Sequence, residues 1–497
     1  MILLILVAAL LVLFYIHCIK TFKYWEQKNV YFEKPLPIFG NFLNVAIRQE
    51  QMGFALKNIY DKLDDTVPYF GVFIFHTPHL VIKSKEFIKQ VLIRDFNYFP
   101  NRNQYTNEKV DPLAANVLFS LKNEVWKTSR NKLTPVFTSG KMKMMLPLMK
   151  EVTDQLEDIL NANNGQEIDI RDLSQKYSVD IISSCAFGIN AGSLKNPKAE
   201  IKKMSDQMLD EKGFKRSFAI FSWFFCPLLV DIFRIPFVEK ESSQFLINVY
   251  KHSSEERKSR NVKRHDLIDL LNELKEEEVE NDIFKFDDVR MSAQALTFFN
   301  AGANGTSTLL SLCLYEMAVN PEIQKTLRTE IVQNLDADGS LSYESLFGME
   351  YLDLVMKEAL RKYPFIHFLA RYAEKDYIFE ETGLKIEKGT KILIPMLAIH
   401  YDEKYYPNPN KFDPERFRGD KMKNLQYVYL SFGEGPRKCI GERFALMSMK
   451  LGLAMFLKNF EISPGTKTEI PLRFTKAATF ITPEKGTIFL KIQKCNS

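Results

Sequence analysis

A cysteine at the end of a loop rich in glycine and proline is the strongest candidate for chemistry in this chain of 497 residues. The loop runs from Phe432 to Gly441 and carries Cys439, and an apolar helical pattern begins directly after the cysteine. A helix N-terminus offers unpaired N–H groups and the positive end of a dipole, which together stabilise a thiolate. We therefore expect Cys439 to deprotonate easily and to serve as an iron ligand.

The neighbours of this cysteine suit a planar cofactor. Gly433, Gly435 and Pro436 allow a tight turn and a close backbone approach, because glycine has no Cβ and proline presets φ. We expect Arg437 to meet an anionic substituent, and Phe432 to pack against a ring face. On residue type alone, a cysteine is more often an inert buried side chain. A dinucleotide fingerprint is disfavoured because the third glycine is absent.

Two further candidate residues lie far upstream of the cysteine loop. Trp126 and Arg130 are four residues apart and share a helical face, and both side chains donate hydrogen bonds. Such donors suit a cofactor that carries carboxylates. On spacing alone, a surface cation–π pair is the commoner interpretation.

The loop resembles the haem-binding signature of the cytochromes P-450, which are haem-thiolate monooxygenases. The matching residues are Phe432, Gly435, Arg437, Cys439 and Gly441. The chain as a whole is most similar to microsomal insect members that handle lipophilic and foreign compounds. The resemblance implies a mainly helical fold with a smaller β-rich portion, in which a long central helix lies over the haem and the cysteine loop lies beneath it. It also implies haem b as the cofactor and Cys439 as the axial ligand of its iron.

The resemblance assigns roles to further residues. Trp126 and Arg130 match the propionate-binding pair, and Arg371 matches another propionate contact. Ala301 lies in the part of the long helix that approaches the haem. The irregular segment 101–119 covers the substrate in the family, although an ordinary surface loop fits its residues equally well.

A charged set behind the cysteine loop is expected to be structural. Glu358 and Arg361 are three residues apart on an amphipathic helix and can pair, although this spacing alone is poorly specific. In the family, such a pair forms a buried network with an arginine that matches Arg416.

The long helix is predicted from about Asp288 to Asn320, ended by Pro321. Gly302 and Gly305 weaken its middle by roughly 1 kcal/mol each relative to alanine. That weakness suits either a groove for dioxygen beside the iron or close helix packing.

This helix departs from the family pattern, in which an acid is followed directly by a threonine. Asn304 stands at the acid, Gly305 at the threonine, and Thr306 comes one place late. One residue turns a side chain by about 100°, so Thr306 reaches the oxygen site only if the helix is locally bulged. Asn304 and Thr306 are the candidate catalytic residues, although an amide cannot exchange protons as a carboxylate does.

The implied reaction is the insertion of one oxygen atom from O2 into a lipophilic small molecule, either a xenobiotic or an endogenous lipid or hormone. Electrons would come from NADPH through NADPH–cytochrome reductase, with cytochrome b5 as a second candidate donor. One alternative is a haem-thiolate isomerase or dehydratase that acts on peroxides, which the altered Asn304-Gly305 pair favours. The other is a catalytically silent haem protein that binds lipophilic ligands.

An apolar N-terminus predicts attachment to a membrane. Residues 1–20 are predicted to be a signal anchor, 21–40 a linker with a proline-rich hinge, and 41–497 a single catalytic domain. Lysines after the apolar run predict that the catalytic domain faces the cytosol. The resemblance to microsomal members implies the membrane of the endoplasmic reticulum. A cleaved secretory signal is the alternative. The aromatic segment 214–237 either dips into the bilayer surface or packs in the core.

Charge and cysteine content exclude other classes. The net charge is only +5 and charge runs alternate in sign, so nucleic acid binding is not indicated. The six cysteines form no CxxC pairs, which favours a reducing compartment. In the family fold, a basic face on the cysteine side would suit an acidic electron donor. Its predicted members are Lys127, Arg130, Lys132, Lys438 and Lys450.

Two hairpins are predicted from β-rich runs that turns interrupt. The first spans 69–83. The second joins 475–481 to 487–492 near the C-terminus, and its tip would line the pocket.

Overall fold

The computed structural model describes residues 2–209, 214–260, 263–277, 283–476, 479–484 and 486–495. Within these ranges, some helical side chains lie outside the description. They are those of residues 2–4, 6–8, 10, 11, 208, 209, 214, 216, 217, 224 and 225.

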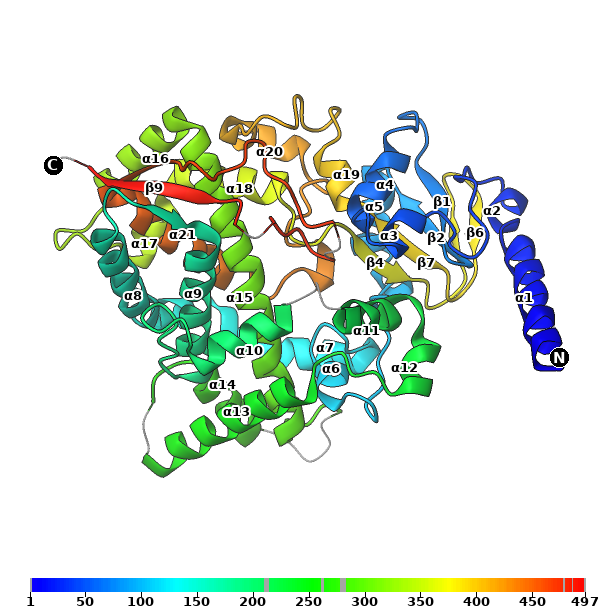
Figure 1. Ribbon diagram of the computed structural model, residues 1–497, viewed down its shortest axis with the longest axis horizontal. Coiled ribbons are helices and arrows are strands. Elements are labelled where there is room, and N and C mark those ends of the chain that lie inside the picture. Colours follow the sequence, from blue (N-terminus) through cyan, green and yellow to red (C-terminus); the bar gives the residue numbers. More distant parts are fainter. Residues whose placement is uncertain are drawn as a thin grey trace.

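The chain is mainly helical, as predicted (Figure 1). The helices are α1 (Ile2–Thr21), α2 (Tyr24–Gln27), α3 (Leu43–Ala46), α4 (Met52–Tyr60), α5 (Lys85–Lys89), α6 (Pro112–Asn116), α7 (Asn123–Leu133), α8 (Ser139–Ala162), α9 (Ile170–Ile182), α10 (Glu200–Leu209), α11 (Phe214–Phe225), α12 (Pro227–Phe233), α13 (Lys240–Arg260), α14 (Leu267–Glu276), α15 (Asp288–Val319), α16 (Pro321–Gln333), α17 (Tyr343–Gly348), α18 (Glu350–Lys362), α19 (Met396–His400), α20 (Lys421–Asn424) and α21 (Glu442–Asn459).

The smaller β-rich portion consists of three sheets. The strands are β1 (Tyr69–Ile74), β2 (Thr77–Ile82), β3 (Glu167–Asp169), β4 (Leu369–Tyr372), β5 (Tyr377–Phe379), β6 (Leu384–Ile386), β7 (Lys391–Ile394), β8 (Phe460–Pro464) and β9 (Phe489–Lys494). The largest sheet has the order β1-β2-β7-β4, in which only the β2–β7 pair is parallel. The other sheets are β3-β9-β8 and β5-β6.

The long helix α15 runs through the centre of the molecule (Figure 1). Its first turn is capped by Asp287, whose side chain accepts a hydrogen bond from the backbone N–H of Arg290 at 2.8 Å. It ends at Val319, and Asn320 is its C-terminal cap before Pro321. Its prediction is therefore confirmed to within one residue. The larger core cluster gathers around α15, and a second cluster lies against the four-stranded sheet.

One predicted hairpin is confirmed and the other is wrong. β1 and β2 pair antiparallel across a short turn, as expected for 69–83. At the C-terminus, β9 pairs with β8 and β3 instead of with the preceding segment. Phe474 and Pro483 form only an isolated bridge. Pairing with distant strands satisfies more backbone groups of β9 than a local hairpin would.

The predicted membrane anchor, residues 1–20, falls on α1, and many of its side chains lie outside the described residues. Over the described part of the chain, no helix is both long and apolar enough to cross a bilayer. Figure 1 shows α1 projecting from the end of the molecule that holds the four-stranded sheet. The anchor, the linker 21–40 and the domain 41–497 remain predictions.

Candidate active site

The cysteine loop is closed by backbone hydrogen bonds. The N–H of Cys439 donates to the carbonyl of Phe432 at 2.8 Å, and α21 begins three residues later at Glu442. Gly433 and Gly435 both have positive φ, of 75° and 71°. A Cβ on Gly435 would lie 2.0 Å from the carbonyl oxygen of Leu92, so this position requires glycine because another backbone segment approaches it.

The Cys439 thiol is accessible, although polypeptide surrounds it on most sides. Burial raises its pKa, and the nearby Glu442 carboxylate adds to the increase. The backbone of Gly441 and the cations Arg102 and Arg130 lower the pKa without cancelling this effect. The expectation that the helix N-terminus alone makes Cys439 easy to deprotonate is therefore wrong. Binding to a metal cation would remove the proton outright.

Two buried arginines, Arg371 and Arg437, lie within electrostatic reach of Arg102, whose charge also acts on Cys439. Arg371 and Arg437 are each 2% exposed. Burial, together with the positive charge of Arg102, lowers the pKa of Arg371 to about 9 and that of Arg437 to about 8. Nε of Arg371 and Nη1 of Arg437 have no hydrogen-bond partner among the described residues. Buried cations that repel one another and keep free donors are suited to an anionic ligand.

Arg102 is a site residue that the sequence did not reveal. Its guanidinium donates to the carbonyl of Arg437 at 2.9 Å and lies 4.2 Å from the ring centroid of Phe119. Burial lowers its pKa to about 10, and its charge acts on Cys439. It lies in the irregular segment 101–119 and belongs to no motif. The one available signal was an arginine in a segment thought to cover the active site.

Trp126 and Arg130 lie on α7 as expected, but not as a surface pair. Trp126 is 5% exposed, and the cation over its ring is Arg437, at 3.8 Å from the centroid. Arg130 is half-buried, and its charge acts on Cys439. The surface cation–π interpretation is therefore wrong, and α7 contributes to the same cationic cluster.

These residues fit a haem. A planar dianionic cofactor needs cations for its carboxylates, a soft ligand for its iron and apolar ring contacts. Arg371 and Arg437 supply buried cations, Arg102 supplies a half-buried one, and Cys439 supplies the sulfur. The half-buried Phe432 lies in the same loop and offers an apolar ring.

One side of the middle of α15 carries side chains that are accessible to solvent. It is α-helical at every residue, so the bulge that would have redirected Thr306 is not formed. Ala301 is exposed although it lies mid-helix, and Asn304 and Thr308 are half-buried. Because each residue turns by about 100°, these three share one side, and Thr306 points about 140° away from Ala301. Thr306 is 3% exposed.

The two helix glycines have different surroundings. A Cβ on Gly302 would lie 2.7 Å from Cδ1 of Ile182 in α9, so close helix packing explains this glycine. A Cβ on Gly305 would meet only Phe365, at an ordinary 3.6 Å. Packing therefore accounts for one glycine and leaves the other free for a different role.

Glu358, Arg361 and Arg416 form one buried network behind the loop. Arg361 donates to both carboxylate oxygens of Glu358, at 2.7 and 2.9 Å, and both side chains are fully buried. Arg416 approaches Glu358 at 3.3 Å. Arg361 also donates to the carbonyl of Pro409 at 2.7 Å, so the network holds the chain segment that precedes the cysteine loop.

One member of the predicted basic face is misplaced. Lys450 is 1% exposed and pairs with Asp353 at 3.2 Å inside the protein. It cannot contribute to a docking surface. Lys127 and Lys438 are exposed by 63% and 42%, whereas Lys132 packs against Phe286.

Comparison with known proteins identifies the family. The family model described as cytochrome P450 matches residues 31–490. Cytochrome P450 6k1 of Blattella germanica is 38% identical over 97% of this chain and 95% of its own length. Probable cytochrome P450 6a13 of Drosophila melanogaster is 38% identical over 97% of each chain, and cytochrome P450 9e2 of Blattella germanica is 35% identical over 93% and 92%.

These similarities cover nearly the whole chain and include insect proteins, as the sequence suggested. They give no support to the peroxide isomerase or to the silent carrier. The family implies a haem cofactor, a lipophilic substrate and electrons from NADPH that a reductase delivers. The chain therefore belongs to the cytochrome P450 family, as a haem-thiolate monooxygenase.

Proposed function

We propose that Cys439 is the axial thiolate of the haem and that Arg102, Arg371 and Arg437 hold its propionates. Trp126 and Arg130 complete this cluster from α7. When bound, the haem supplies the activation of dioxygen and carries the oxidation. The protein provides the thiolate, neutralises the carboxylates and controls access of water and substrate. The observation that carries the proposal is that Arg102 acts electrostatically both on the accessible Cys439 and on two buried, incompletely paired arginines, Arg371 and Arg437.

Proton handling on the substrate side is assigned to α15. Asn304 and Thr308 share the accessible side of the helix with Ala301, and Oδ1 of Asn304 has no hydrogen-bond partner among the described residues. The Asn304 amide can hold a water, and the Thr308 hydroxyl can both accept and donate a proton. These two residues take the role first given to Asn304 and Thr306. Thr306 is instead assigned to the packed side of the helix.

The substrate is a lipophilic molecule that meets an aromatic wall. Phe365 and Phe480 stack with ring centroids 4.8 Å apart, and Phe365 lies beside Gly305 of α15. Phe480 comes from the C-terminal segment that was predicted to reach the pocket. Such a wall has few polar groups with which to orient a substrate, which suits foreign compounds of varied shape. We propose xenobiotics as the substrate class.

We propose that the protein associates with the endoplasmic reticulum, with its catalytic domain in the cytosol. Leu228, Ile232 and Phe233 of α12 are each more than 60% exposed. The turn between β1 and β2 connects this region to α1, since His76 contacts Phe14. The adjacent Phe75 contacts Phe221 of α11. One apolar surface next to the anchor would rest on the bilayer and receive lipophilic substrates.

An oxygen balance tests the reaction. Purified holoenzyme, reductase and NADPH are combined with a panel of lipophilic substrates, with and without cytochrome b5. Product and hydrogen peroxide are counted against the NADPH consumed. We expect hydroxylated product to account for a substantial part of the NADPH. NADPH lost wholly to peroxide with every substrate would contradict the proposal.

A further inference from the structure

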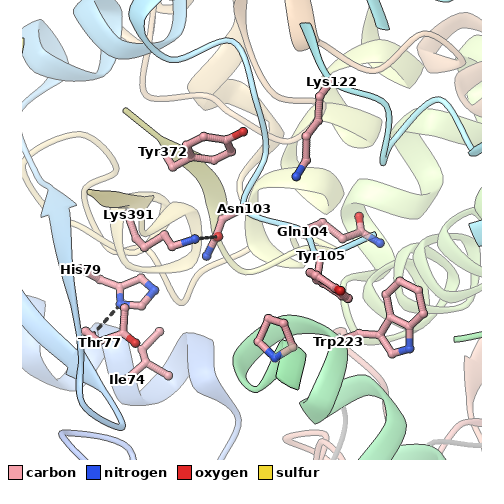
Figure 2. A pocket seen from close by; sticks show the side chains of 11 residues that line it. Ile74, Thr77, His79, Asn103, Gln104, Tyr105, Lys122, Trp223, Tyr372 and Lys391 are labelled. Atoms are coloured by element: carbon pink, nitrogen blue, oxygen red, sulfur yellow. Dashed lines mark hydrogen bonds between the residues drawn. The ribbon is translucent and has the colours of Figure 1, made fainter. Parts of the chain in front are cut away.

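A cavity of about 310 Å³ lies against the four-stranded sheet (Figure 2). Its floor includes His79 of β2, Lys391 of β7 and Tyr372 of β4, which stand opposite one another in the strand register. Residues paired in this way share a face of the sheet. Arg371 directly precedes Tyr372 in β4 and so points to the opposite face. The sheet therefore stands between this cavity and Arg371, and the cavity lining includes none of the arginines of the proposed haem site.

Two lysine ammonium groups enter the cavity. Lys122 and Lys391 place Nζ at 5.8 and 5.5 Å from the centroid of the same Tyr372 ring. Burial lowers the pKa of both, and the charge of Lys122 lowers that of Lys391 further. Nζ of Lys391 donates to the side chain of Asn103 (Figure 2). Neither lysine has a carboxylate within salt-bridge distance in the described part of the chain.

Other charged groups nearby do not neutralise this pair. Glu374 acts on Lys122 electrostatically, but it does not line the cavity. Its carboxylate accepts a hydrogen bond from Asn101 at 3.1 Å. His79 is buried, and burial lowers its pKa to about 3, so it is neutral. The cavity therefore has a net positive end without an acidic partner of its own.

The opposite end of the cavity is apolar and aromatic. Ile74, Tyr105, Trp223 and Pro227 supply the apolar and aromatic lining. Figure 2 shows Ile74 and Trp223 below Tyr372 and Lys122 in the view. Trp223 is fully buried and its indole N–H donates to the carbonyl of Ile235 at 2.8 Å, so its ring is held rigidly. The volume lies near the lower limit for small-molecule sites, about 300–1,000 Å³.

We propose that this cavity binds a single-chain amphipathic carboxylate, with its anionic group between Lys122 and Lys391 and its chain against Ile74 and Trp223. Two partly desolvated cations gain charge-assisted hydrogen bonds from a carboxylate and lose their mutual repulsion. The apolar end removes the chain from water. A ligand with both parts satisfies both ends, whereas a small inorganic anion satisfies only one.

Calorimetric titration of the holoenzyme with decanoate tests this site. An imidazole inhibitor is kept bound to the haem iron, so that binding beside the iron is blocked. We expect saturable binding at one site, weakened about tenfold or more in Lys122→Met/Lys391→Met. Lys122→Arg/Lys391→Arg, which keeps both charges, should bind decanoate within about threefold of the unmodified enzyme. The ferrous–carbon monoxide spectrum of each variant checks that it has folded with haem.

Matched ligands and a surface variant complete the test. Decanol, which has the chain without the charge, and inorganic phosphate, which has charge without a chain, should each bind about tenfold or more weakly. Lys423→Met, which removes an exposed lysine of α20, should leave binding unchanged. If the double variant fails to fold, Lys122→Met alone serves, with a smaller loss. Equal affinity for decanol, for phosphate, or in the methionine variants would overturn the proposal.

Discussion

Two threonines two residues apart on α15 have opposite surroundings. Thr306 is 3% exposed among core side chains, whereas Thr308 is half-buried on the side that carries Ala301. The sequence pattern favoured Thr306, because that residue is adjacent in sequence to the expected threonine position. Helical geometry favours Thr308 instead, because it lies one turn after Asn304 and Gly305. Proximity along a helix is a poor guide to which side a residue occupies.

The roles of the Thr306 and Thr308 hydroxyls can be distinguished by mutation. Thr308→Val should lower product formation by about tenfold to a hundredfold and raise peroxide, because a positioned proton donor is lost. Thr306→Val is the matched control and should leave the ratio of product to NADPH unchanged. The amounts of product and hydrogen peroxide formed per NADPH consumed distinguish the two variants. Loss of coupling in Thr306→Val alone would return the catalytic role to Thr306.

His400 makes the stability of the folded protein depend on pH, and it holds the segment that directly precedes the cysteine loop. It is fully buried, and its ring accepts a hydrogen bond from the N–H of Leu430 at 3.0 Å, while its Nδ1 lies 3.0 Å from the carbonyl of Arg361. Burial lowers its pKa to about 3. Between the ordinary value near 6.5 and about 3, the unfolded chain binds a proton that the folded protein does not. Stability therefore falls as pH falls, by up to about 1.4 kcal/mol per pH unit for this residue.

Urea unfolding of the holoenzyme between about pH 7 and about pH 5 measures this effect. His400→Gln should lower the unfolding midpoint at neutral pH, because two buried hydrogen bonds are altered, but should also flatten its decline on acidification. His252→Gln, which changes an exposed histidine of α13, should keep the full decline. A decline of unchanged steepness in His400→Gln would contradict the assignment.

At the scale of elements, α18 connects the charge network to the haem side. Glu358→Ala should lower the free energy of unfolding by about 3–5 kcal/mol, because two buried guanidinium groups would lose their carboxylate. Lys357→Ala on the same helix removes a partly exposed pair with Asp353 and should cost about 1 kcal/mol or less. Chemical denaturation of both variants, monitored by haem absorption, gives the comparison. Similar losses in the two variants would refute a buried network.

Elements with local signals were predictable and elements with distant partners were not. α15 has a capping Asp287 and a terminating Pro321, and the β1–β2 turn is local, so both were found. β9 pairs with strands more than 20 residues away in sequence, and no local pattern records that choice. The same holds for the site. The Cys439 loop could be predicted because its residues form a local motif, whereas Arg102 could not, because only folding brings it to the carbonyl of Arg437.

At the scale of the whole molecule, an exposed basic surface on the cysteine side remains a prediction. Lys127 and Lys438 are the most exposed members of the predicted set, and the buried Lys450 no longer belongs to it. Lys438→Glu should raise the KM for reductase by about tenfold at low salt and leave kcat at saturating reductase unchanged, because rim charges mainly affect encounter. High salt should remove the difference. Reductase titrations at two ionic strengths measure it.

The control for this surface is Lys423→Glu, which reverses an exposed charge on α20 outside the predicted set. It should leave the KM for reductase unchanged at both salt concentrations. If Lys438→Glu behaves like this control, the reductase does not dock at the cysteine side through these lysines.

The absorption spectrum of the ferrous–carbon monoxide complex tests the central assignment most directly. The unmodified holoenzyme should show the red-shifted Soret band of thiolate ligation, and Cys439→His should retain haem but lose that band. Cys226→Ser, which changes a half-buried cysteine outside the site, should keep it. A thiolate band that persists in Cys439→His would show that another residue ligates the iron and would contradict the account.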